Sequence, residues 1–345
     1  MTGQVARQAS AVRVACGKLA RLLRAMAQLR PSLLQDIAWR LEALGFDLLT
    51  ALARALPIDL VSDFGAWLFQ RLGPLTSAHR TARTNLRIAF PDAPREEIDR
   101  LLSEQWAHAG RWAMEFPILD RIIADPTRVE VVGGERLAQI ARDKQPVVFI
   151  SGHFSSFEIM PAAIIHAGVT CQITYRAANN PYVDARFKAS RWRYGVRLFA
   201  PKGGDGAREL IDAMRRGESV ALMNDQKFNG GVAAPLFGVM AHTAPGPSRL
   251  ALRFDTVLQP MSVQRKDKAR FRVVVHEPIR LQQTGDRTAD IEAGVRQVNA
   301  FIEDRVRERP AEWFWVHKRW PNEVYRKRGP DPSPLADEGG GEADG

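Results

Sequence analysis

The apolar and polar residues of this chain follow two different patterns, and the change comes near residue 129. Before it, apolar residues recur at helical spacing. This spacing predicts helices over residues 33–56, 60–71 and 95–115. The first 30 residues also place leucines near helical spacing, with arginines between them. They read either as a loose leader or as a basic amphipathic helix that lies on an anionic membrane.

After residue 129, short apolar runs alternate with helical stretches. The predicted strands cover residues 146–151, 170–176, 196–201, 219–224, 256–264 and 271–278. The predicted helices cover residues 156–167, 182–194, 207–216, 246–254 and 291–309. This alternation predicts an α/β fold, in which a mixed, mostly parallel sheet is flanked by helices.

The patterns divide the chain into four regions. Residues 1–35 form a basic leader that can lie on a membrane surface, and residues 36–128 form a helical region that associates with the membrane. Residues 129–328 form the α/β domain, and residues 329–345 form an acidic tail whose Pro and Gly content predicts disorder. No uninterrupted apolar run reaches the roughly 18 residues typical of a membrane-spanning helix.

The chain is strongly basic, with a net charge of +10 over 345 residues. Residues 1–35 hold six cations and no acid, and residues 329–345 hold five acids and no cation, which leaves +9 on the middle. Such a surface predicts an anionic partner: nucleic acid, an anionic membrane, an acidic protein or a phosphorylated substrate. The only cysteines, Cys16 and Cys171, lack metal-ligand spacing, so neither a disulfide framework nor a metal site is expected.

The most informative residues are His153 and Glu158, which follow the predicted strand 146–151. An open α/β sheet places its chemistry at the carboxyl ends of its strands. A histidine can take a proton near neutral pH, and a neighbouring carboxylate can fix its tautomer. Five positions on one helix subtend about 140°. The two side chains can therefore meet only if His153 lies in the turn and Glu158 in the first helical turn.

A second interpretation of the same residues is structural. Ser155-Ser156-Phe157-Glu158 matches a capping box, in which the glutamate binds backbone rather than the histidine. The spacing alone leaves both interpretations open.

Five further patterns occur in the chain: Gly152-His153-Phe154 with Glu158, Asn85-Leu86 with Phe90-Pro91, Tyr175-Arg176 with Asn180-Pro181 and Asp184, Asn224-Asp225-Gln226 with Pro235-Leu236-Phe237-Gly238, Thr243 and Gly246, and Trp313-Phe314-Trp315 with His317, Arg319 and Trp320. In order and spacing over roughly residues 40–325, these segments resemble those of the bacterial lipid A biosynthesis acyltransferases, the late acyltransferases that use acyl carrier protein. The first segment matches the histidine-x4-acid motif of that family.

The chain departs from this family pattern at two places. Ser155-Ser156-Phe157 stands where the family usually has Gly-Asn-Trp, which bears on the acceptor or the acyl chain. The N-terminal region carries charges where the family commonly begins with a clearer membrane-spanning helix, which bears on the mode of membrane attachment.

The resemblance implies a fold of the glycerol-3-phosphate acyltransferase type and transfer of a fatty acyl chain from acyl carrier protein to a hydroxyl of a lipid A precursor. It implies His153 as general base, oriented by Glu158. Residues implied to bind substrate or the oxyanion are Arg176, Asp225, Gln226, His317 and Arg319. No cofactor is expected beyond acyl carrier protein, which brings the co-substrate. The implied location is the cytoplasmic face of the inner membrane, an anionic surface.

Two alternatives remain at this point. The first is acylation of another glycolipid, such as phosphatidylinositol mannoside, whose acyltransferases share the histidine-x4-acid signature. The second is a non-enzymatic basic protein that binds a membrane surface or nucleic acid, in which His153 and Glu158 are structural. The aromatic and basic run over residues 313–320 favours the second alternative, and the absence of a recognisable nucleic-acid module argues against it.

Overall fold

The computed structural model describes residues 31–201 and 204–327, so the first 30 residues and the acidic tail lie outside the described residues. The chain forms two compact units. Among the described residues, the smaller unit contains residues 31–49 and 178–186, and the larger contains residues 50–177, 187–201 and 204–327. A short later segment, residues 178–186, thus groups with the first described helix.

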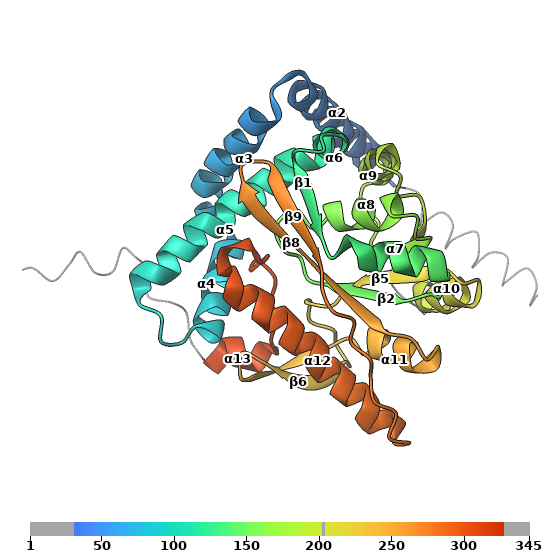
Figure 1. Ribbon diagram of the computed structural model, residues 1–345. Coiled ribbons are helices and arrows are strands. Elements are labelled where there is room, and N and C mark those ends of the chain that lie inside the picture. The colour runs from blue at the N-terminus through green and yellow to red at the C-terminus, as the bar shows by residue number, and fades with distance from the viewer. Residues whose placement is uncertain (1–30, 202–203, 328–345) are drawn as a thin grey trace, which may run out of the picture. The chain divides into compact units, whose positions relative to one another are not determined.

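Helices come first along the described chain (Figure 1). They are α2 (Leu33–Ala55), α3 (Ile58–Leu72), α4 (Ser77–Ala89), α5 (Arg95–Glu115) and α6 (Leu119–Ala124). The sequence predicted α2, α3 and α5 but not α4. Only two large apolar side chains of α4, Leu86 and Ile88, enter the core among its arginines and threonines, so its apolar period is weak. No helix among residues 31–201 and 204–327 is long and apolar enough to cross a membrane.

The larger unit is built on a seven-stranded sheet with strand order β1-β9-β8-β2-β5-β3-β4. The strands are β1 (Val129–Val132), β2 (Val148–Ser151), β3 (Cys171–Tyr175), β4 (Phe199–Pro201), β5 (Ser219–Met223), β8 (Leu258–Asp267) and β9 (Arg270–Val275). Every neighbouring pair is parallel except β8 and β9, which are antiparallel. The predicted mixed, mostly parallel sheet is confirmed.

Helices cover both faces of this sheet (Figure 1). Successive side chains of β2 alternate between two cores, as the two-residue period of a strand requires. Val148 and Ile150 enter a core shared with α11 (Gly246–Arg253) and α12 (Arg287–Glu308), whereas Phe149 enters a core shared with α7 (Gly134–Asp143) and α8 (Ile159–His166). Because β2 is buried on both faces, only its carboxyl end is left to present chemistry.

The remaining elements are α9 (Pro181–Arg193), α10 (Gly204–Arg215), α13 (Asn322–Lys327) and a separate hairpin of β6 (Val232–Leu236) and β7 (Val239–Thr243). The sequence did not predict the hairpin, because Pro235 interrupts its first strand. Its two-residue turn, Phe237 and Gly238, has positive φ at both positions, the geometry of a tight hairpin.

Candidate active site

His153 and Asp225 occupy equivalent places on two neighbouring parallel strands. Ser151 ends β2, Met223 ends β5, and the two residues are paired in the sheet register. His153 and Asp225 each follow two residues later, so the register delivers both side chains to the same edge of the sheet. This is the strand-end location that the sequence predicted for His153.

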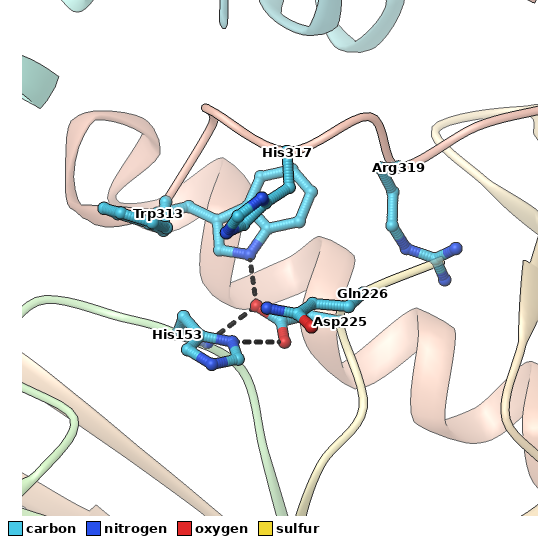
Figure 2. Close-up of a pocket in the computed structure, with 7 residues that line it drawn as sticks. His153, Asp225, Gln226, Trp313, His317 and Arg319 are labelled. Atoms are coloured by element: carbon cyan, nitrogen blue, oxygen red, sulfur yellow. Dashed lines mark hydrogen bonds and ion pairs between the residues drawn. The ribbon is translucent and has the colours of Figure 1, made fainter. Parts of the chain in front are cut away.

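Asp225 binds His153 at two points (Figure 2). Asp225 Oδ1 lies 2.7 Å from the ring Nδ1 of His153, and Asp225 Oδ2 accepts a hydrogen bond of 2.7 Å from the backbone amide of His153. The indole Nε1 of Trp313 donates a third hydrogen bond, 2.8 Å long, to Asp225 Oδ2. The carboxylate is thus fixed by one ring nitrogen, one amide and one indole.

The electrostatics of Asp225 suit an orienting carboxylate. Its side chain is buried, and burial alone would raise its pKa. The charge of His153 and the hydrogen bonds from His153 and Trp313 outweigh burial and hold the pKa of Asp225 well below its usual value. The ionised Asp225 accepts a hydrogen bond from the N–H at Nδ1 of His153 and so holds the ring proton on Nδ1. This leaves Nε2 as the basic nitrogen. No hydrogen bond within residues 31–201 and 204–327 uses Nε2.

The turn after β2 explains why a glycine precedes the histidine. A Cβ on Gly152 would lie 2.7 Å from Cζ of Phe154 and 3.3 Å from Oδ2 of Asp225, so a larger residue would push on the orienting carboxylate. Ser155 follows with φ of 47°, the left-handed region that favours glycine. The family resemblance places glycine at this position, so the departure to serine is a strained substitution within the same turn.

The structure corrects the expected position of Glu158. Its carboxylate accepts hydrogen bonds from Arg191 Nη2 at 2.6 Å, Arg191 Nε at 2.9 Å and the Tyr194 hydroxyl at 3.3 Å, and it makes none with His153. The capping-box interpretation is also wrong. The Ser155 amide donates to the Glu312 carbonyl instead, and α8 begins at Ile159 with no side-chain cap from Glu158.

Glu158 and Arg191 form a buried ion pair. Glu158 is 7% exposed, and burial of Arg191 lowers its pKa less than the charge and hydrogen bonds of Glu158 raise it, so the pKa of Arg191 lies above its usual value. The Arg191 guanidinium also lies 4.7 Å from the ring centre of Tyr175, the last residue of β3. The Glu158–Arg191 pair therefore connects the start of α8 with α9 and with the end of β3.

Three other predicted site residues line the pocket beside His153 and Asp225, and one does not. Figure 2 shows Gln226, His317 and Arg319 around this pocket, whose lining is completed by Trp313 and Phe314. Arg176 follows β3 at the same edge of the sheet but is exposed and is not part of the lining.

Arg319 is a buried member of the pocket wall. It is 2% exposed and donates to the His242 carbonyl, the Thr243 hydroxyl and the Asn299 side-chain oxygen. Burial lowers its pKa to about 10, against the raising effect of Asp225, so it remains a cation at neutral pH. Its guanidinium anchors the C-terminal segment to the end of β7 while contributing positive charge to the pocket wall.

Asn85 holds the C-terminal segment that carries Trp313, His317 and Arg319. Its side-chain amide donates to the carbonyls of Trp315 (2.6 Å) and His317 (2.7 Å), and its oxygen accepts a hydrogen bond of 2.5 Å from the Tyr325 hydroxyl. Asn85 itself is fully buried, its bond to the Trp315 carbonyl is buried, and its bonds to His317 and Tyr325 are partly buried.

Sequence reasoning placed Asp225 among the substrate contacts and missed its contact with His153. A signal was present: each residue follows an apolar run, Val148–Ser151 or Ser219–Met223, at the same offset of two. Arg191 carried no such signal, because the sequence of α9 shows no separation of apolar and polar faces from which a buried arginine could be recognised. The tryptophans at 313, 315 and 320 are buried, and Trp313 also donates a hydrogen bond to Asp225.

A histidine held by a buried carboxylate, beside a pocket at the edge of an α/β sheet, is an arrangement for general-base catalysis. The fold and site are thus those of a protein suited to proton transfer at the edge of its sheet. A family model described as bacterial lipid A biosynthesis acyltransferase matches residues 26–322. The chain belongs to this family and is an acyltransferase of lipid A biosynthesis. This membership favours the enzymatic prediction over a non-enzymatic binding protein.

Individual relatives are distant in sequence. The chain is 22% identical to a lipid A biosynthesis palmitoleoyltransferase of Escherichia coli (strain K12), over 69% of this chain and 77% of that protein. It is 25% identical to a lipid A biosynthesis acyltransferase of Haemophilus influenzae, over 77% of this chain and 85% of that protein. A solved 1-acyl-sn-glycerophosphate acyltransferase from Thermotoga maritima aligns with 74% of this chain and 96% of its own, at 16% identity and a TM-score of 0.33.

Proposed function

We propose that this protein transfers a fatty acyl chain from the thioester of acyl carrier protein to a hydroxyl of a lipid A precursor, at the cytoplasmic face of the inner membrane. The observation that carries the proposal is the His153–Asp225 pair, which leaves one basic nitrogen beside a pocket in a chain of the lipid A acyltransferase family.

The reaction needs a base because a hydroxyl is a poor nucleophile while it keeps its proton. Nε2 of His153 takes that proton as the hydroxyl oxygen attacks the thioester carbonyl carbon. The tetrahedral intermediate then collapses, the carbon–sulfur bond breaks, and His153 returns the proton to the leaving thiolate. The products are an ester and the free thiol of the carrier, and no covalent enzyme intermediate is needed.

Asp225 supports both proton transfers. It holds the ring in the tautomer that leaves Nε2 basic, and its negative charge stabilises the imidazolium that forms between the two steps. Glu158 serves the same site indirectly in this proposal: paired with Arg191, it fixes the start of α8 and so the turn that carries His153.

The pocket and the protein surface supply positive groups for anionic substrates. We assign Gln226 and His317, which face the pocket, to donate hydrogen bonds to the oxyanion of the tetrahedral intermediate. Arg319 adds a buried positive charge to the same wall. We assign Arg176, which is exposed at the end of β3, to bind a phosphate of the acceptor. The phosphates of a lipid A precursor and the acidic surface expected of acyl carrier protein both complement the basic body.

The test is a reaction with purified protein, a lipid A precursor and acyl carrier protein loaded with acyl chains of different lengths. We expect mass spectrometry to show a precursor heavier by one acyl ester, together with free carrier thiol. Mass spectrometry of lipid A from cells with and without the gene would give the acceptor position. Acyl transfer from another donor, or to another glycolipid only, would overturn the assignment.

A further inference from the structure

Two consecutive residues of the C-terminal segment, Glu312 and Trp313, reach both partners of the His153–Asp225 pair. The indole of Trp313 donates a hydrogen bond of 2.8 Å to Asp225 (Figure 2). The carbonyl of Glu312 accepts a hydrogen bond of 2.7 Å from the amide of Ser155, which lies in the turn that carries His153. The position of these two residues, which we call the 312–313 dipeptide, therefore bears on the carboxylate and on the histidine.

The turn after β2 is strained and is held from outside. Ser155 has a φ of 47°, in the left-handed region, which is uncommon for a residue other than glycine. Phe154 pairs with Trp313 in an isolated antiparallel bridge, outside the named strands. A strained backbone persists only where its surroundings over-determine it. The shape of the turn thus depends on where the 312–313 dipeptide lies.

The carboxylate of Glu312 anchors the dipeptide to β8. Glu312 is 7% exposed, and its Oε2 accepts a buried hydrogen bond of 2.9 Å from the backbone amide of Arg265. In the described sheet, β8 pairs with β2 only at residues 258–260, so the carboxylate supplies the acceptor that a neighbouring strand would offer further along. Oε1 accepts a hydrogen bond of 2.7 Å from Nη1 of Arg309, and this nitrogen also donates to the Arg265 carbonyl.

Arg265 is itself fixed in the core of the larger unit. Its guanidinium donates to both carboxylate oxygens of Glu115 on α5, at 2.6 and 2.8 Å, and both side chains are buried. Glu115 also accepts a hydrogen bond of 2.6 Å from the Ser62 hydroxyl on α3. The anchor of Glu312 therefore ends on helices α3 and α5 of the core and not on a surface loop.

We propose that Glu312 is a positioning residue for acyl transfer: its carboxylate holds the 312–313 dipeptide on β8 and so sets the geometry of the His153–Asp225 pair. The inference rests on the proposed function for the reaction that the pair performs, but not for the anchoring. Glu312 acts through the position of the backbone and not by proton transfer, because its side chain lines a separate cavity, together with Phe154, and not the pocket beside His153.

Loss of this anchor should slow the chemical step more than it weakens substrate binding. A base must lie within hydrogen-bond reach of the proton that it takes, and a misplacement of about 1 Å can cost about 10²-fold in rate. Because Glu312 does not line the pocket, KM should change little. A fall in kcat at nearly constant KM marks an interaction that matters only in the transition state.

The test compares two replacements of Glu312 with a matched control, each assayed where circular dichroism shows a folded protein. Glu312→Leu removes both acceptors, and we expect kcat to fall by about 10–10²-fold with KM changed less than about threefold. Glu312→Gln keeps one oxygen for the Arg265 amide and should retain kcat within about threefold of the wild type. The control is Glu308→Leu, which removes another glutamate that lines the same cavity and pairs with Arg305 at 2.9 Å, and it should turn over like the wild type.

A double-mutant cycle distinguishes positioning from a general loss of structure. Asp225→Asn already impairs the pair that Glu312 positions, so Glu312→Leu should slow this background by less than about threefold. A residue that merely stabilised the fold would slow the wild type and the Asp225→Asn variant by the same factor.

A second readout does not depend on the reaction. A histidine N–H that is bound to a carboxylate gives a proton NMR signal at low field, and His153→Ala identifies the signal of His153 by removing it. Glu312→Leu should shift or broaden this signal, whereas Glu308→Leu should leave it in place. If the wild type acylates no lipid A precursor but the signal depends on Glu312, the proposed function fails and the anchoring stands.

Three results would overturn the inference: a folded Glu312→Leu protein with wild-type kcat, an equal fall in both arms of the cycle, or an unchanged His153 signal in that variant. If Glu312→Leu does not fold, Arg309→Met takes its place, because the Arg309 side chain is 42% exposed and its loss leaves the bond to the Arg265 amide intact. We expect Arg309→Met to lower kcat by about three- to tenfold, and wild-type turnover by that variant would equally contradict the inference.

Discussion

Asp225 fixes both the ring and the backbone of His153: one carboxylate oxygen lies 2.7 Å from the ring Nδ1, and the other accepts a 2.7 Å hydrogen bond from the amide. The carboxylate that orients the histidine therefore comes from the end of a neighbouring strand and not from the acid five residues downstream. In the proposed mechanism the histidine of the histidine-x4-acid motif, His153, is the base, whereas Glu158, the acid of the motif, forms a buried ion pair with Arg191.

The first prediction separates these functions. Glu158→Gln leaves the Arg191 charge buried without its counterion, so we expect the free energy of unfolding to fall by about 3–5 kcal/mol. Glu158→Gln/Arg191→Met removes both charges at similar volume and should recover most of that loss. Urea denaturation measures the free energy of unfolding of the single and the double variant.

Activity of the double variant decides the role of Glu158. If the glutamate only fixes the start of α8, the folded double variant should keep its acyl-transfer rate within about tenfold of the wild type. A double variant that is stable but inactive would show that Glu158 takes part in the chemistry.

The second prediction concerns Asn85. Asn85→Ala leaves the Trp315 and His317 carbonyls without their donor, which costs about 1–3 kcal/mol for each buried group left unpaired. Because the C-terminal segment that Asn85 holds carries the pocket residues Trp313, His317 and Arg319, kcat should also fall under conditions in which the variant is still fully folded. Thr84→Ala, on the same helix, removes only a solvent-exposed hydrogen bond to the Arg80 carbonyl and should change neither quantity measurably.

The third prediction is a loss of stability in mild acid. Burial, aided by the charges of Arg305 and Arg136, lowers the pKa of His276 to about 4, and burial beside Arg265 and other arginines lowers the pKa of His108 to about 3. Both folded-state values lie below the unfolded value of about 6.5. Their contribution to stability is therefore complete above pH 6.5 and is lost as the pH falls toward 4.

The slope should reach about 1.4 kcal/mol per pH unit for each histidine. Unfolding free energies at pH 8, 6.5 and 5 measure it. His276→Gln, which can keep the hydrogen bond to Ser262 without titrating, should flatten the profile, while His166→Gln on the surface should not. Equal slopes for all three proteins would contradict the assignment.

The sequence predicted the mostly parallel sheet and the strand-end location of His153 because both follow from local patterns. The apolar run of β2 ends at a glycine and a histidine, and that pattern alone places His153 at a strand end. The partner of His153 could not be read in the same way, because it depends on which strands are neighbours. Sheet order, in which β5 lies beside β2, is set by packing across the whole domain.

For Glu158, local spacing in the sequence led to two wrong predictions. Its spacing from His153 suggested two local roles, an orienting acid and a helix cap, and the structure shows neither. Its partner Arg191 lies 33 residues away on α9, and nothing in the sequence near Glu158 points to it. A buried ion pair between residues far apart in the sequence can be recognised only once the fold is known.

The most direct test of the central claim is the rate of acyl transfer to a lipid A precursor by Asp225→Asn. Asparagine keeps the shape of the side chain but removes the charge that fixes the tautomer of His153. We predict that kcat falls by about 10²–10⁴-fold, with little change in KM, and that His153→Ala falls at least as far. An Asp225→Asn enzyme that is folded and turns over at close to the wild-type rate would contradict the account.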